Sequence, residues 1–236
     1  MVTGIVAALL PEARILSSDK FSGGQLVCLR PDVLVIISGI GAERARAAAL
    51  RLIEKGAHAL LSWGCAGGLA PHLLPGSVVI PEKIFGSDGS VYSCDESWTR
   101  RVCGKLQPSI TVVRGALAET PLVLASRREK MNLGKRGAVA VDMESASIAR
   151  AAKEAGVPFI AIRAISDAVD ADLPGCLAES VNEFGRVRPL ALLKATASRP
   201  ADIPKLIRTA RNFGRAKAAL SAVSARLAFN FQGSEL

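Results

Sequence analysis

Residues 141–170 read VDMESASIARAAKEAGVPFIAIRAISDAVD and contain the pattern that decides the fold class. Residues 145–155 are rich in alanine and are predicted to form a helix, which Gly156 ends. The apolar run at 159–164 then predicts a buried strand. A helix followed by a buried strand is the unit from which α/β folds with parallel sheets are built.

The same alternation of strands and helices extends towards the N-terminus. Strands are predicted at residues 4–10, 26–29, 33–37, 59–63, 77–81, 110–114 and 121–124, and a helix at 43–55. Residues 85–108 are polar and show no clear pattern. These elements predict an α/β fold with a mostly parallel central sheet.

Composition limits the kind of protein. The chain has 236 residues, of which half are hydrophobic and only 4% aromatic, which suits helices stacked on a buried sheet. No apolar run approaches the roughly 20 residues that span a bilayer, and we expect no signal peptide. Five scattered cysteines without a C-x-x-C pair indicate a reduced, cytoplasmic protein. With only His58 and His72 and no clustered ligands, no metal site is expected.

The excess positive charge lies in the C-terminal region. Residues 186–226 hold ten of the thirty Lys and Arg residues but only one acid, Asp202, so the rest of the chain is neutral. Apolar residues there keep near-helical spacing, while the basic side chains lie on other faces: Lys205, Arg208, Arg211 and Arg215. Such a helix could lie on an anionic membrane, or pack on the body with its charges solvated. Nucleic-acid binding is a further alternative, but no aromatic residues alternate with the basic ones.

Small and polar residues follow the predicted strands. Because ligands of open α/β sheets bind outside the carboxyl ends of the strands, we expect Arg14, the 38–41 turn, the 64–68 turn and the Ser166–Asp167 pair to be neighbours. The sequence Gly-Cys-Ala-Gly-Gly at 64–68 lets the backbone approach a ligand closely, although it equally suits a tight turn between a strand and a helix.

Three carboxylates are candidates for chemistry. Asp142 and Glu144 precede a helix, where acids are favoured by the helix dipole without any site. Glu144 could also bind the paired hydroxyls of a ribose. Asp167 follows a strand at the functional edge, where a partly buried carboxyl group can donate a proton.

Together these stretches resemble the nucleoside phosphorylase superfamily over about residues 3–175, and the nearest well-known branch is the methylthioadenosine/S-adenosylhomocysteine nucleosidases. The resemblance is carried by Gly4–Ala8 with Glu12, Ser38–Gly41, Gly64–Leu69, Asp142–Ser145 and Arg163–Asp167. It implies a three-layer α/β/α phosphorylase/hydrolase-like fold with a mixed, mostly parallel sheet. It also implies a catalytic domain over 1–180, a basic helical extension over 181–236 that packs on the same domain, and a homodimer.

The resemblance also implies roles for individual residues. Asp167 would protonate the purine leaving group at N7, with Ser166 orienting it, and Glu12 would activate the attacking water. Glu144 would bind the ribose hydroxyls, and Met143 would pack at the sugar. The remaining substrate-binding residues would be Asp142, Ser38, Ala66 and Gly67. No cofactor is implied, but phosphate as a co-substrate would use Arg14 and Arg44, so hydrolysis and phosphorolysis both stay open.

Two regions depart from the nucleosidases. Residues 122–127 read LVLASR where the nucleosidases carry Ser-Gly-Asp and an aromatic side chain against adenine. The longer C-terminal region, including residues 185–200, resembles the hopanoid-associated phosphorylase subfamily. The sequence of residues 140–145 also resembles that subfamily. That subfamily is linked to the removal of adenine from adenosylhopane. A lipid-linked nucleoside substrate and a position on the inner membrane face are therefore implied. Cleavage of small adenosine thioethers, or purine nucleoside phosphorylase activity, is the alternative.

Overall fold

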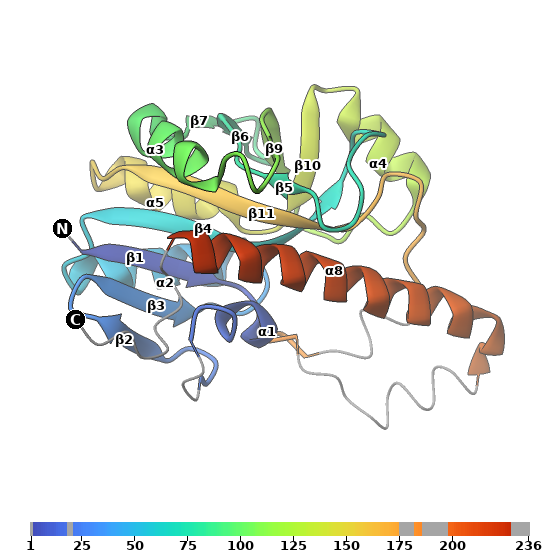
Figure 1. The fold of residues 1–236 in the computed structure, drawn as a ribbon, viewed down its shortest axis with the longest axis horizontal. Coiled ribbons are helices and arrows are strands. Elements are labelled where there is room, and N and C mark those ends of the chain that lie inside the picture. The colour runs from blue at the N-terminus through green and yellow to red at the C-terminus, as the bar shows by residue number, and fades with distance from the viewer. Residues whose placement is uncertain (1, 18–20, 175–181, 186–197, 228–236) are drawn as a thin grey trace.

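The computed structural model describes residues 2–17, 21–174, 182–185 and 198–227 (Figure 1). The predicted domain boundary at 180–181 and most of residues 185–200 lie outside this part of the chain. The strands are β1 (Thr3–Ala7), β2 (Leu26–Arg30), β3 (Val33–Ile37), β4 (Ala59–Gly68), β5 (Val78–Val79), β6 (Lys83–Phe85), β7 (Val91–Ser93), β8 (Val112–Val113), β9 (Ala116–Glu119), β10 (Ala138–Asp142) and β11 (Phe159–Asp167). The helices are α1 (Leu10–Ala13), α2 (Ala42–Glu54), α3 (Glu96–Leu106), α4 (Arg127–Gly134), α5 (Ser145–Glu154), the 3-10 turn η1 (Pro200–Asp202) and α8 (Ile203–Leu227).

Strand β4 is the centre of a mixed sheet. On one side its first half pairs in parallel with β1, and its last residues, Gly67 and Gly68, pair antiparallel with β10. On the other side it pairs in parallel with β11. The strand order is β2-β3-β1-β4-β10-β9-β6-β7; off this path, β11 pairs with β4 and β5, and β5 pairs with β8. The predicted mixed sheet with parallel pairing at its centre is therefore confirmed.

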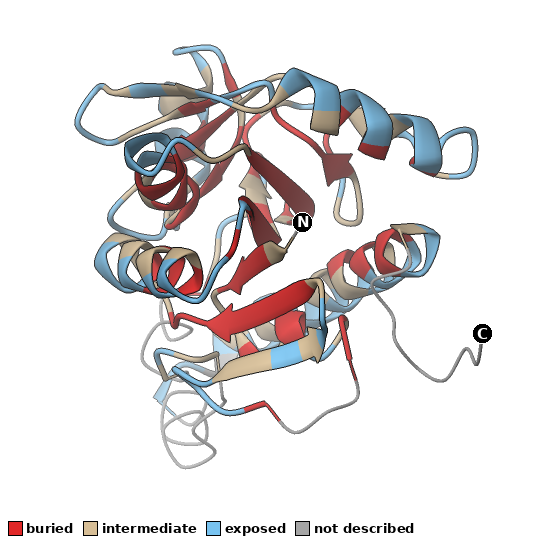
Figure 2. Ribbon diagram, turned by 90° about the vertical axis from the view of Figure 1, so that its left-hand side faces the viewer, coloured by how far each residue is buried: buried red, intermediate tan, exposed pale blue. Residues whose placement is uncertain are grey.

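Helices cover both faces of this sheet. Apolar residues of α2 and α5 pack on one face, and those of α1, α3 and α8 pack on the other. The central strands lie between these layers and are buried, as the red strands in Figure 2 show. All five residues of β3 are buried, because a strand with helices on both faces has no side exposed to water. The fold has three layers, as predicted.

Helix α8 belongs to the core at one end only. Ala216, Leu220 and Val223 are buried in the same cluster as β11 and α3. At the other end, which extends beyond the sheet in Figure 1, Ile203 is 41% exposed and Ile207 is 58% exposed. The predicted apolar stripe therefore divides into a buried C-terminal part and an exposed N-terminal part. No helix in the described part of the chain is long and apolar enough to cross a membrane.

Several predicted elements are wrong in position or type. The strand expected at 121–124 is a loop with exposed Leu122 and Val123, and the strand lies earlier, at β9. The glycine-rich run at 64–68 is no turn to a helix, because it continues β4 between β10 and β11. Residues 85–108, which show no pattern, hold β7 and α3. Local composition does not reveal which partner strands the fold places beside a segment.

Candidate active site

The candidate site lies along the carboxyl half of β4. Ala7 at the end of β1 pairs with Trp63, and Asp167 at the end of β11 pairs with Gly67. The segment that follows β1, which includes α1, therefore lies beside the carboxyl half of β4. The end of β11 lies beside the same half of β4. The topology brings together the strand ends that the sequence predicted to be neighbours.

Glu12 lies at one end of this half-strand. It is on α1 and is buried, and its Oε1 accepts a hydrogen bond of 2.8 Å from the amide of Cys65. Its Oε2 accepts a bond of 3.0 Å from the amide of Leu9. A Cβ on Gly64, whose φ is +156°, would stand 2.7 Å from the Glu12 carboxylate, so only glycine admits it there. Burial raises the pKa of Glu12, although the Cys65 amide and the charge of Arg163 oppose this.

Glu144 reaches the site from the start of α5. Its Oε1 accepts a 2.8 Å hydrogen bond from the amide of Gly41, the residue before α2, and its Oε2 accepts a 3.2 Å bond from the amide of Met143. Burial, and next the charge of Asp142, raise the pKa of Glu144 to about 8, against the opposing effects of the Gly41 amide and Arg163. A carboxyl group that titrates near neutrality can change its protonation state when a ligand binds.

Asp142 lies behind the site and fixes the start of α5. Its Oδ2 accepts hydrogen bonds of 2.8 Å from Arg163 Nε and 2.5 Å from the Ser145 hydroxyl. Its Oδ1 accepts bonds from the amides of Glu144 and Ser145 at the start of α5. The structure therefore places Asp142, which the sequence predicts to bind substrate, in a buried ion pair that fixes the α5 terminus and hence Glu144.

Arg163 is a functional residue whose role sequence reasoning missed. It is only 3% exposed, and besides Asp142 it donates hydrogen bonds of 2.5 Å to the Ser62 hydroxyl and 2.9 Å to the Ser145 hydroxyl. Burial opposes its charge, but Asp142, Glu12 and Glu144 together raise its pKa. The signal was available, because a cation inside an apolar strand needs a buried acidic partner.

Asp167 lies at the other end of the half-strand. Its Oδ1 is 2.7 Å from the Ser166 hydroxyl, which also lies 3.3 Å from the carbonyl of Ala66. Its Oδ2 accepts a hydrogen bond from the ammonium of Lys130, a buried residue of α4. Nothing in the sequence marked Lys130, because the surrounding Arg-Arg-Glu-Lys run is typical of a solvated helix surface.

The remaining predicted residues surround these groups. Gly67 flanks the acid, since a Cβ there would be 3.2 Å from Asp167 Oδ2, and Met143 is partly buried beside Glu144. The Ser38 hydroxyl donates to the carbonyl of Gly39, so its proton is used within the turn. The two candidate phosphate residues, Arg14 after α1 and Arg44 at the start of α2, are both exposed.

Two further groups complete the description of the site. Glu119, which sequence reasoning also missed, is buried and accepts hydrogen bonds from the amide and hydroxyl of Ser147, and so supports the first turn of α5. Burial raises the pKa of the Cys65 thiol well above its usual range, which keeps it neutral and a poor nucleophile. In the described part of the chain, no three His, Cys, Asp or Glu side chains are grouped to hold a metal ion.

The raised pKa of Glu144 predicts a dependence of stability on pH. Between its ordinary value of 4.5 and its folded value of about 8, folded Glu144 holds a proton that the unfolded chain has released. The proton that only the folded state binds in this range makes the free energy of unfolding depend on pH. The contribution of Glu144 to stability is fully present below pH 4.5 and is lost as the pH rises through 8. Glu144→Gln stays uncharged, so its melting temperature should fall less than that of the wild type over this range. Thermal unfolding of both proteins at several pH values measures this, and parallel curves would contradict it.

Comparison with known proteins shows which sequences this chain is similar to. The chain matches the phosphorylase superfamily over residues 6–197. It is 28% identical over 240 residues to the 5′-methylthioadenosine/S-adenosylhomocysteine nucleosidase of Shewanella halifaxensis, covering 82% of this chain and 99% of that one. A protein of the same name from Bacillus thuringiensis is 28% identical over 181 residues, covering 66% of this chain and 76% of the other.

Solved structures show the same fold. The nucleosidase of Neisseria meningitidis in complex with methylthio-immucillin-A has a TM-score of 0.69 and 19% identity, covering 96% of this chain and 98% of that one. Futalosine hydrolase of Helicobacter pylori has a TM-score of 0.67 and 19% identity, covering 95% and 97% of the two chains.

Proposed function

Because the chain belongs to the phosphorylase superfamily, we propose that it hydrolyses the bond between adenine and ribose in a lipid-linked nucleoside, adenosylhopane. The observation that carries the proposal is a set of three buried carboxylates: Glu12 and Asp167 lie along the carboxyl half of β4, and Glu144 accepts a hydrogen bond from the Gly41 amide. The coarser activity, cleavage of the N-glycosidic bond of an adenine nucleoside, is supported by the nucleosidases among the relatives.

Each carboxylate suits one part of this reaction. Breaking the bond from C1′ to the base builds positive charge on the ribose, as in glycoside hydrolysis. Asp167 gives a proton to the leaving base, whose ring takes the electrons of the broken bond. Glu12 takes a proton from the water that adds to C1′, and Glu144 binds the ribose hydroxyls. Hydrogen bonds from two backbone amides hold Glu12 in place, and burial raises its pKa, which makes the carboxylate a stronger base.

The choice of a lipid-linked substrate is supported by α8. Its N-terminal half leaves Ile203 and Ile207 exposed, with exposed Lys205, Arg208 and Arg211 beside them. Apolar side chains among cations are what an amphipathic helix presents to an anionic membrane surface. Figure 1 shows that this half of the helix extends away from the body of the protein.

A second candidate is a nucleosidase for 5′-methylthioadenosine and S-adenosylhomocysteine. It is favoured by the names of the relatives from Shewanella halifaxensis and Bacillus thuringiensis. The two candidates share the three carboxylates and differ only in the group on the 5′ carbon. The α8 surface is therefore the feature that separates them.

The deciding experiment measures adenine release from adenosylhopane, 5′-methylthioadenosine and S-adenosylhomocysteine, each with and without phosphate. We expect adenosylhopane to have the highest kcat/KM and phosphate to have no effect. A higher kcat/KM for either thioether would favour the second candidate. Formation of a ribose 1-phosphate would show phosphorolysis in place of hydrolysis.

Replacing Lys205, Arg208, Arg211 and Arg215 with Gln is expected to lower activity on adenosylhopane in anionic vesicles by at least tenfold. Each basic side chain near such a surface contributes about 1 kcal/mol of attraction. Cleavage of a short, soluble 5′-alkyl adenosine should not change, because the three carboxylates are untouched. High salt should reproduce the loss, since the screening length falls from about 8 Å at physiological ionic strength to about 3 Å at 1 M.

A matched control replaces four exposed cations elsewhere with Gln: Lys55, Arg100, Arg101 and Lys105. This control should leave the activity on vesicles unchanged. Equal losses on both substrates in the α8 variant would show that these cations support the fold. No loss on either would remove the α8 surface as support for a lipid-linked substrate.

A further inference from the structure

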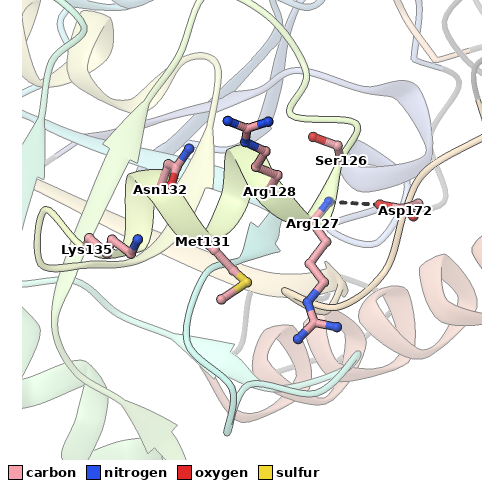
Figure 3. A pocket seen from close by; sticks show the side chains of 7 residues that line it. All are labelled: Ser126, Arg127, Arg128, Met131, Asn132, Lys135 and Asp172. Carbon is pink, nitrogen blue, oxygen red and sulfur yellow. Dashed lines mark hydrogen bonds between the residues drawn. The ribbon is translucent and has the colours of Figure 1, made fainter.

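Helix α4 carries one buried cation that the proposed roles leave unused. Exposed side chains of its outer face, among them Arg127 and Arg128, and of its C-terminal cap, Lys135, line a cavity of about 500 Å³ (Figure 3). Lys130 lies on the other side of the helix and is 1% exposed. Its surroundings therefore differ from those of the other basic residues on α4.

All three ammonium hydrogens of Lys130 have acceptors. One goes to Asp167 Oδ2, and the others to the carbonyls of Ala168, at 3.1 Å, and Ala171, at 2.8 Å. Removing an ammonium group from water is costly, and a buried ion pair is often no more stable than apolar residues of the same volume. The requirements of folding alone therefore do not explain a lysine at this position.

We propose that Lys130 is a positioning residue for protonation of the leaving base and acts through Asp167. This inference rests on the proposed role of Asp167 as proton donor. The ammonium holds Oδ2 from one side, while Ser166 lies against Oδ1, so the carboxyl group is fixed between them. When the bond from C1′ to the base breaks, its electrons pass to the base and the proton of Asp167 passes to the base nitrogen. Asp167 is left as a carboxylate.

The cation favours this step because an opposite charge in contact stabilises a carboxylate. Asp167 later regains a proton from solvent for the next turnover. The carbonyls of Ala168 and Ala171 fix the ammonium, so the charge does not have to move during the reaction. Charges that are already oriented when the reaction begins stabilise it most effectively.

The test uses two ribosides with the same short 5′-alkyl group, one bearing adenine and the other 4-nitrophenol. 4-Nitrophenolate leaves without a proton, so its release does not need Asp167 or Lys130. Lys130→Met should lower kcat on the adenine riboside by about 10- to 100-fold. This is less than the full factor of about 10²–10⁴ that a general acid contributes, because Asp167 itself is still present. On the nitrophenyl riboside the loss should stay below threefold. Lys135→Met, at the exposed C-terminal cap of the same helix, should change neither rate.

The ratio of the two rates is measured on one preparation, so a partly unfolded sample does not alter it. Lys130→Gln, which lacks the charge but keeps a donor for the two carbonyls, is a second variant if Lys130→Met does not fold. Equal losses on both ribosides, or no loss on either, would overturn the proposal. Asp167→Asn is the reference: if it is selective for the adenine riboside and the Lys130 variants are not, only the inference about Lys130 fails. If Asp167→Asn is not selective, the proton-donor role in the proposed function fails as well.

Discussion

Asp167→Asn is expected to lower kcat on adenine nucleosides by about 10²–10⁴-fold, the usual contribution of a general acid. An asparagine has the same shape and still accepts the hydrogen bond from the Ser166 hydroxyl, but its amide cannot protonate the leaving base. The KM should change little, because Glu144 and the backbone of β4 are untouched. Steady-state kinetics on one adenine nucleoside measures both constants.

The same substitution should also destabilise the fold. It removes one partner of the buried pair with Lys130, and breaking such a pair costs about 3–5 kcal/mol. Kinetics should therefore be measured at a temperature where circular dichroism shows the variant to be folded. Activity within threefold of the wild type would show that Asp167 is not the proton donor.

Glu12→Gln is expected to lower the rate of hydrolysis by a similar factor, about 10²–10⁴-fold, because an amide cannot take a proton from water. The structure adds a second reason. Both carboxylate oxygens of Glu12 accept hydrogen bonds from backbone amides, those of Leu9 and Cys65. The NH₂ group of a glutamine would face one of these donors, leaving both groups unsatisfied at a cost of about 1–3 kcal/mol.

Measuring the products separates the chemical role of Glu12 from its structural one. In the presence of phosphate, hydrolysis yields the free sugar and phosphorolysis yields a sugar 1-phosphate. If Glu12 activates water, the variant should lose formation of the free sugar and gain no sugar 1-phosphate. Formation of the free sugar within threefold of the wild-type rate would contradict the assignment of Glu12 as the base.

The α/β fold class could be predicted from the sequence because the signals for its strands and helices are local. Apolar runs such as 33–37 and 159–164 are buried strands whichever partners they have, and the helix at 145–154 begins and ends close to the positions that its neighbours indicate. Where the burial of a segment depends on a distant partner strand, local composition predicted the wrong secondary structure. Leu122 and Val123 have the apolar character of a strand but are exposed, because β9 has already filled the place beside β10.

The sequence determined one part of the site and the tertiary structure determined the other. The sequence by itself determined the residue types: Glu12, Glu144 and Asp167 occur in short motifs at strand and helix ends, where a parallel sheet gathers its ligands. Only the tertiary structure decided the partners of these carboxylates. The pairing of Glu144 with the Gly41 amide spans 103 residues and that of Asp167 with Lys130 spans 37. Such contacts form because burial leaves a charged group no water to bind, so it takes whichever partner the packing of the layers brings within reach.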